Sequence, residues 1–130
     1  MIVVDAAGLY EVVSKGPRAE QVRLKLDSDP ELVAPHVIDV EVLSAIRRDH
    51  MRGLLDPTAA RLAVDELRDW PGIRLGHQPL LRRTWELRDN VRGWDAFYVA
   101  LAEILRAPLV TLDARLARAP GLRCEIQVLN

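Results

Sequence analysis

The chain has 130 residues, 49% of them apolar and 28% charged, which is the balance of one folded domain and not of a disordered polypeptide. Its single cysteine, Cys124, excludes an internal disulfide and a cysteine-built zinc site. The longest apolar run, Ala96–Ala102, is far too short to span a membrane, and no basic residue precedes Lys15 as one would in a secretory signal. We therefore expect a single cytoplasmic domain, residues 1–130, with no membrane association.

The charged residues are balanced in number but biased in kind. Eighteen basic residues against nineteen acidic ones give a net charge of −1, so charge alone neither indicates nor excludes a nucleic-acid partner. Sixteen of the eighteen are arginine, since only Lys15 and Lys25 are lysine. The guanidinium group suits bidentate contact with phosphate. The codons of a GC-rich genome also favour arginine, so the bias by itself is weak support for a phosphate-bearing partner.

Apolar periodicity and turn residues predict strands that alternate with helices along the chain. We expect strands at 2–4, 32–34, 73–75, 109–112 and 125–129, and helices at 6–14, 18–26, 37–51, 57–70, 79–87, 95–106 and 114–118. This alternation predicts an α/β domain with a mostly parallel central sheet. In such a sheet the carboxyl ends of the strands share one edge, and ligands bind at that edge.

Four acidic residues fall where this layout brings them to the ligand-binding edge. Asp5 and Asp113 each follow a strand, whereas Asp95 and Glu41 lie in the first turn or two of a helix. Like charges 4 Å apart repel by roughly 1 kcal/mol in water and about 4 kcal/mol near a protein surface. Oxygen donors with no lysine nearby suit Mg²⁺ or Mn²⁺. The pattern therefore predicts metal-assisted hydrolysis of a phosphate ester, through one ion or two.

Each acid also has a purely structural interpretation. Asp5 and Asp113 could cap the helices that follow them, and Asp95 could favour the dipole of its own helix by about 0.3–1 kcal/mol. Asp39 competes with Glu41, because both closely follow the second predicted strand. The two side chains lie about 200° apart around a helix, so at most one can face the edge. Periodicity leaves that choice open.

The segments that carry these acids resemble the signature of PIN domains. The matching segments are Ile2–Asp5, Glu41–Arg47, Trp94–Glu103 and Leu109–Asp113. The length of the chain and the order of its elements resemble the VapC toxins of bacterial type II toxin–antitoxin modules. The run from Asp95 to Glu103 and the closing Thr111 and Asp113 are the most specific parts of this resemblance.

The resemblance implies a three-layer α/β/α PIN domain over the whole chain. It also implies an endoribonuclease that depends on Mg²⁺ or Mn²⁺, forms a homodimer and is inhibited by a VapB-type antitoxin. The catalytic and metal-binding acids of the family correspond to Asp5, Glu41, Asp95 and Asp113, with Thr111 as a supporting polar residue. The alternative function is a PIN fold that binds RNA or protein without significant catalysis.

The resemblance favours Glu41 over Asp39, which becomes a charge at a helix N-terminus. The chain departs from its relatives at Ala7, where Ser or Asn is frequent, and at Ser44, where Asn is frequent. Neither position supplies a metal-binding carboxylate, so the expected activity is retained, although the orientation of the ligands could differ.

Two other classes of enzyme with acids at strand ends fit the sequence less well. A phosphoaccepting receiver domain needs a lysine late in the chain, and the only lysines are Lys15 and Lys25. A dehalogenase-type phosphatase needs a second acid two residues after Asp5, where Ala7 stands. All four acids of the PIN pattern are present, which argues for catalysis over binding alone.

Several residues around these acids are candidates for contact with RNA or a protein partner. Arg47, Arg92 and Arg115 are the arginines best placed to contact RNA phosphates. Trp94 could stack on an unpaired base, but we favour core packing for it. An apolar excess after the third predicted helix could line a groove for an antitoxin helix, with core packing favoured for Leu62 and Leu67. The residues of that excess are Leu54, Leu55, Leu62, Leu67 and Trp70.

Overall fold

The computed structural model describes residues 1–130, and its elements alternate as expected. The strands are β1 (Ile2–Val4), β2 (Leu32–Pro35), β3 (Ile73–Leu75), β4 (Leu109–Thr111) and β5 (Ile126–Val128). The helices are α1 (Ala6–Val13), α2 (Ala19–Asp27), α3 (Val37–Met51), α4 (Pro57–Asp69), α5 (Leu81–Glu86), α6 (Asp95–Leu105) and α7 (Ala114–Ala117), and a 3-10 turn, η1 (Gln78–Leu80), precedes α5.

All five strands run parallel, in the order β3-β2-β1-β4-β5. The chain begins in the central strand β1, moves outward through β2 to β3, and then returns to the other side of β1 for β4 and β5. The direction of winding therefore reverses between β1 and β4. This is the position at which open parallel sheets bind their ligands.

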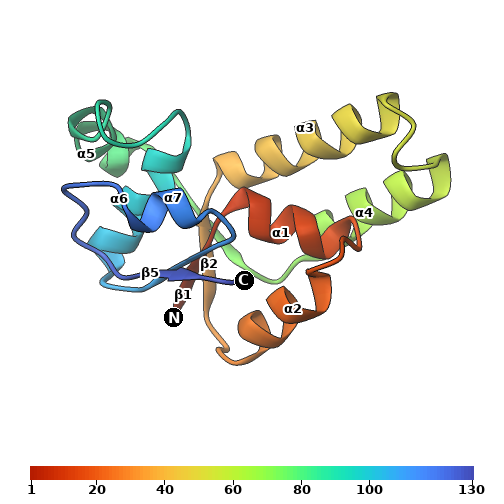
Figure 1. The fold of residues 1–130 in the computed structure, drawn as a ribbon, viewed down its shortest axis with the longest axis horizontal. Coiled ribbons are helices and arrows are strands. Elements are labelled where there is room, and N and C mark those ends of the chain that lie inside the picture. Colours follow the sequence, from red (N-terminus) through yellow and green to blue (C-terminus); the bar gives the residue numbers. More distant parts are fainter.

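Helices cover both faces of this sheet and give the three-layer α/β/α arrangement that was expected (Figure 1). Helix α6 packs against β1, β2 and β4, with α5 on its outer side, while α1 and α3 cover the other face together with α2 and α4. Because both faces are covered, the strands can be apolar throughout, and Ile2, Val3 and Val4 are all buried. Helices α3 and α4 continue beyond the sheet as an antiparallel hairpin (Figure 1).

No helix in the structure combines the length and the apolar character that crossing a membrane would need.

The apolar excess near the α3–α4 hairpin divides between core and surface. Leu67 and Trp70 are buried and Leu55 packs partly against the core, so the expectation for Leu67 is confirmed. Core packing was the wrong expectation for Leu62, which is 46% exposed because the outer part of α4 extends past the sheet. Leu54, in the turn between the two helices, is 70% exposed.

Arg74 joins the end of α4 to β3. Its guanidinium donates to the backbone carbonyls of Leu67 (2.8 Å), Trp70 (2.7 Å) and Gly72 (3.0 Å), and it lies 4.9 Å from the centre of the Trp70 ring. It also pairs with Asp39 on α3 at 2.9 Å. The Leu67 carbonyl also accepts from the backbone N–H of Trp70 at 3.3 Å, whereas Arg74 supplies the donor for the carbonyls of Trp70 and Gly72, which lie beyond the last turn of the helix.

We predict that Arg74→Lys lowers the free energy of unfolding by about 2 kcal/mol, because a lysine ammonium cannot reach all these acceptors and each buried group left unpaired costs about 1–3 kcal/mol. Urea denaturation measures this. The matched control is Arg68→Lys, since Arg68 forms an exposed ion pair with Asp69 and should change stability by less than about 0.5 kcal/mol. Equal effects of the two changes would contradict the prediction.

Candidate active site

A cleft of about 530 Å³ opens at the carboxyl edge of the sheet. The starts of α1, α3 and α6 gather there with α7 (Figure 1). Three of the four acids identified in the sequence, Glu41, Asp95 and Asp113, line the cleft. The fourth, Asp5, is only 6% exposed, and it lies near enough to Asp95 and Asp113 for their charges to raise its pKa. The topology therefore brings all four acids to one region.

Asp5 is anchored by two hydrogen bonds. Its Oδ1 accepts from the backbone N–H of Gly8 at 2.8 Å and so caps α1, and its Oδ2 accepts from the hydroxyl of Thr111 at 2.5 Å. The Thr111 hydroxyl oxygen in turn accepts from the backbone N–H of Asp113 at 3.0 Å. Burial raises the pKa of Asp5 to about 6 despite these bonds. Thr111 thus contacts Asp5 directly and links it to Asp113.

Glu41 is half-buried on α3 and is held by a buried residue of α6. The hydroxyl of Tyr98, on α6, donates to its Oε1 at 2.7 Å. Burial raises the pKa of Glu41, and the nearby charges of Asp95 and Asp5 raise it further. Sequence reasoning missed Tyr98, although a signal was present: it is the one hydroxyl in the apolar run Ala96–Ala102, and it lies one helical turn after Asp95.

Asp95 has a freer carboxylate than Asp5 or Glu41. Neither a side chain nor a backbone group donates a hydrogen bond to it. Partial burial and the charge of Asp113 raise its pKa, and Arg115 and Arg92 lower it in part. Its oxygens therefore remain available to a ligand in the cleft.

Asp113 differs from the other three acids because a guanidinium compensates its charge. Both of its oxygens contact Arg115, each at 3.1 Å, and its Oδ1 also caps α7 through the backbone N–H of Arg115 at 2.9 Å. These contacts hold the pKa of Asp113 below its ordinary value. The charge of Asp113 still raises the pKa of Asp5 and Asp95, so the pKa values raised by neighbouring acids are those of Asp5, Glu41 and Asp95. As the side chains stand, no three His, Cys, Asp or Glu residues are grouped closely enough to hold a metal ion.

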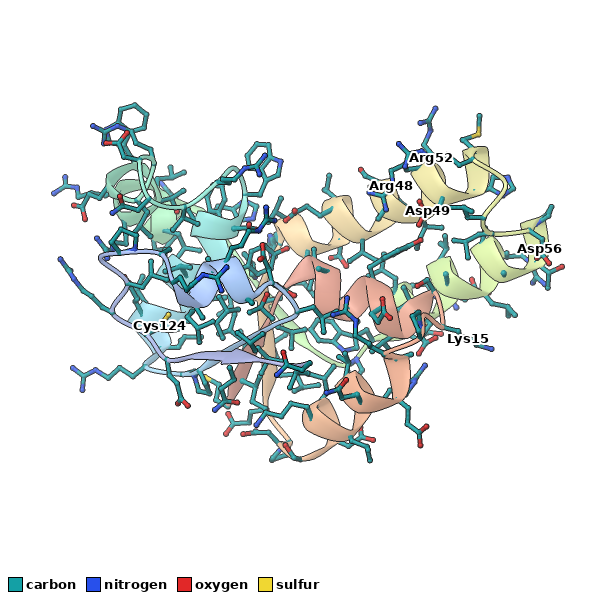
Figure 2. All side chains as sticks on the ribbon, in the orientation of Figure 1. Lys15, Arg48, Asp49, Arg52, Asp56 and Cys124 are labelled. Carbon is teal, nitrogen blue, oxygen red and sulfur yellow. The ribbon has the colours of Figure 1, made fainter.

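The remaining candidates are spread more widely. Asp39, the competitor of Glu41, points to another part of the fold, where it pairs with Arg74. Among the candidate RNA contacts, Arg92 and Arg115 line the cleft, whereas Arg47 is exposed on α3 outside it. Figure 2 shows Arg48 and Arg52 on the outer half of α3, and Cys124 at the opposite end of the molecule.

Core packing was the wrong expectation for Trp94. Its side chain is 60% exposed and lines the cleft. Trp94 is the residue that precedes α6, and Gly93 before it has a φ of +48°, a conformation that glycine adopts at little cost. The turn places the indole outside the core, where it stacks on Phe97 with 6.1 Å between the ring centres.

Comparison with known proteins agrees with this geometry. The PIN domain family model matches residues 2–122. The chain is 43% identical to Ribonuclease VapC1 of Mycobacterium tuberculosis, a match that covers 98% of this chain and 97% of that protein. The chain belongs to the VapC family of PIN-domain proteins. It is also 36% identical to VapC ribonuclease Mb0985 of Mycobacterium bovis, over 99% of this chain and 98% of that one.

Solved structures of VapC proteins share the fold despite low sequence identity. VapBC2 of Rickettsia felis, solved with a DNA fragment from the promoter, matches with a TM-score of 0.72 at 15% identity over the whole of both chains. VapC20 of Mycobacterium tuberculosis, described as a sarcin-ricin loop cleaving toxin, matches with a TM-score of 0.69 at 18% identity over 96% of this chain and 99% of that one. The PIN-like fold expected from the sequence is therefore confirmed.

We predict that stability in chelator falls as pH rises from about 4 to about 7. The pKa of Asp5 is about 6 in the folded protein against an ordinary value of 3.8, so folding takes up a proton between these values. This stabilisation is complete below the lower pKa and is lost as pH rises through the upper one, a change of roughly 3 kcal/mol. Urea denaturation across this pH range measures it.

The control for this prediction is Asp5→Asn, which has no proton to take up at that position. Carboxylates whose pKa is lowered by folding, such as Asp113, make the protein more stable as pH rises. They are present in both proteins, so the difference in stability between wild type and the variant reports Asp5 alone. Parallel pH profiles for the two proteins would show that Asp5 does not carry a raised pKa.

Proposed function

We propose that this VapC protein is the toxin of a type II toxin–antitoxin module and acts in the cytoplasm as an endoribonuclease dependent on Mg²⁺ or Mn²⁺. The observation that carries the proposal is that Glu41 and Asp95 line one cleft and that the buried Asp5, from a third element, lies close enough for the charges of the three acids to interact. The relatives named as ribonucleases, which match along nearly their whole length, support the same activity.

A divalent cation fits the donors of this cleft. Asp5, Glu41 and Asp95 have hard carboxylate oxygens, and those of Asp95 accept no hydrogen bond from the protein. Burial raises the pKa of all three acids, neighbouring negative charges raise it further, and a bound cation would favour the ionised form of each. Asp113 could join the set if it turned away from Arg115, which would complete the four-carboxylate site inferred from the sequence. When bound, such an ion polarises a phosphate and lowers the pKa of water.

The surrounding residues would position this chemistry. Thr111 and the backbone of Gly8 hold Asp5 in one orientation, and Tyr98 does the same for Glu41. Arg92 and Arg115 line the same cleft and could contact the phosphates that flank the scissile one. In this arrangement the buried acids would hold the cation that contacts the reacting phosphate, and the more exposed arginines would hold the RNA backbone.

The proposed partners are a VapB-type antitoxin, the RNA substrate and a second copy of the chain. The VapBC2 structure from Rickettsia felis supports the antitoxin, because its fold matches this chain along its whole length. The exposed side chains of Leu54 and Leu62 on the α3–α4 hairpin are apolar surface that an amphipathic antitoxin helix could cover.

One observation favours the alternative function, a PIN fold that binds RNA or protein without catalysis. Asp113 is engaged by Arg115, and no three acidic residues are grouped for an ion in the structure as it stands. Such a module would bind RNA equally well with and without a divalent ion and would leave it intact. The substitutions below separate the two functions.

We expect Asp5→Asn, Asp95→Asn or Glu41→Gln each to reduce divalent-dependent RNA cleavage by more than about 100-fold, because substitution of residues that merely orient metal ligands already costs about 10–100-fold. A cleavage assay on bulk RNA, with Mg²⁺ or Mn²⁺ and with chelator, measures this. Asp39→Asn is the control, since Asp39 pairs with Arg74 and should lose stability but keep most activity. Full activity of the first three variants, each shown to be folded, would contradict the assignment.

We expect Tyr98→Phe to weaken Mn²⁺ binding by about 10–100-fold, because Glu41 loses the hydrogen bond that orients it. Isothermal titration calorimetry on the protein without RNA reports this change independently of cleavage. Tyr10→Phe is a matched control, since the Tyr10 hydroxyl also donates to a carboxylate, that of Asp49 on α3, away from the cleft. Equal Mn²⁺ affinity in the Tyr98→Phe and Tyr10→Phe proteins would show that Tyr98 does not orient a metal-binding residue.

A further inference from the structure

A second hollow lies directly beside the carboxylate cleft and shares two of its walls. It has a volume of about 470 Å³, within the range of roughly 300–1,000 Å³ typical of small-molecule sites. Glu41 and Trp94 line both spaces, so the two hollows are adjacent. The other lining residues of the second hollow are Val37, Val40, Ser44, Ala45 and Arg48.

One face of α3 forms most of this hollow. Its contributing residues recur at intervals of three and four along the helix, from Val37 to Arg48, and so lie in one stripe. The stripe is open to solvent, with Val40 64% exposed. It mixes small apolar side chains with the Ser44 hydroxyl and two charges, which is a surface more suited to a polar, planar ligand than to an apolar helix.

Trp94 supplies a flat aromatic wall to the hollow. The ring is supported from one side by Phe97, which in turn contacts His77 at 5.1 Å between ring centres. The other two tryptophans each carry an arginine over the ring, Arg74 on Trp70 and Arg88 on Trp85, whereas Trp94 has none. Most of the Trp94 indole is therefore free to stack on a ligand.

We propose that Trp94 and this face of α3 form a subsite for the unpaired base of a nucleotide adjacent to the scissile phosphate. The inference rests on the proposed ribonuclease function and specifies its substrate: RNA that is single-stranded at the cleavage site, because only an unstacked base can present its face to the indole. Because Glu41 and Trp94 line both spaces, a nucleotide next to a phosphate at the carboxylates would lie beside the indole. Arg48 lines the same hollow about 10 Å along α3 from Glu41, and it would contact a following phosphate if it left Asp49, with which it pairs.

The test measures RNA binding without cleavage. All proteins carry Asp5→Asn, and the probe is a short labelled single-stranded RNA that spans a cleavage site mapped with the wild-type protein and is recovered intact after binding. We expect Trp94→Ala to weaken binding by about tenfold and Trp94→Tyr to retain most of the affinity, since loss of one stacked base costs about that much. Trp85→Ala, at an equally exposed tryptophan outside both spaces, should bind as well as the parent.

A second probe identifies the base itself. In this probe the nucleotide next to the mapped cleavage site is abasic, and the parent protein should bind it about tenfold more weakly than the complete RNA. The Trp94→Ala protein should bind both RNAs equally, because the partner of that base is already missing. A duplex version of the probe should show no dependence on Trp94.

Three results would overturn the inference. The first is unchanged affinity of the Trp94→Ala protein, and the second is the same abasic penalty with and without Trp94. The third is a Trp94→Ala protein that changes from dimer to monomer in sedimentation while each protomer keeps its RNA affinity, which would show that a second copy of the chain covers this face. If the wild-type protein cleaves no RNA at all, the proposed function fails instead, before any of these comparisons is made.

Discussion

The hydrogen bond between Thr111 and Asp5 is the contact on which the rest of the site depends. The two residues are 106 positions apart in sequence and follow or end the two strands between which the sheet reverses its winding. Burying a carboxylate there is unfavourable, as its raised pKa shows, and the Thr111 hydroxyl and the N-terminus of α1 offset part of that cost. This one contact therefore joins the beginning of the chain to its end and fixes the deepest acid of the cleft.

The buried acids of the site and the acid at its rim have different kinds of hydrogen-bond donor. Deep acids are held by neutral donors, the hydroxyls of Thr111 and Tyr98, which orient a carboxylate without neutralising it. At the rim, Asp113 meets a full positive charge in Arg115. The negative potential is thus strongest where the chain is least exposed, and a cation entering the cleft would move toward it. Guanidinium groups remain at the mouth, where an anionic backbone would arrive.

The sequence predicted the scaffold well because the scaffold rests on patterns local to the chain. Helix α3 has the predicted bounds, and Asp56 caps α4 with Pro57 in its first turn. Four of the five strands begin at the expected residue, and β5 begins one residue later, at Ile126, since each strand follows from periodicity. The edge to which the acids converge also followed from topology. Strand and helix ends differ by one or two residues, as with β4, which stops at Thr111.

The individual partners of the acids could not be predicted, because they depend on which side chains meet across the fold. Nothing local in the sequence pairs Asp39 with Arg74 or Glu41 with Tyr98, since each pair joins elements at least thirty-five residues apart. Trp94 was misplaced for a related reason. A large aromatic residue beside an apolar helix usually packs inward, and only the backbone turn at Gly93 directs it outward.

The pairing of Arg115 with Asp113 couples the binding of a cation in the cleft to the binding of a phosphate. One guanidinium faces two competing anions, the carboxylate of its own chain and any phosphate that enters the cleft. A phosphate that draws Arg115 away leaves Asp113 free to contact a cation, and a cation that draws Asp113 away leaves Arg115 free to contact a phosphate. Each ligand would thus raise the affinity for the other by the same factor, as thermodynamic linkage requires. Asp113 would therefore be released from Arg115 most fully when a cation and a phosphate occupy the cleft together.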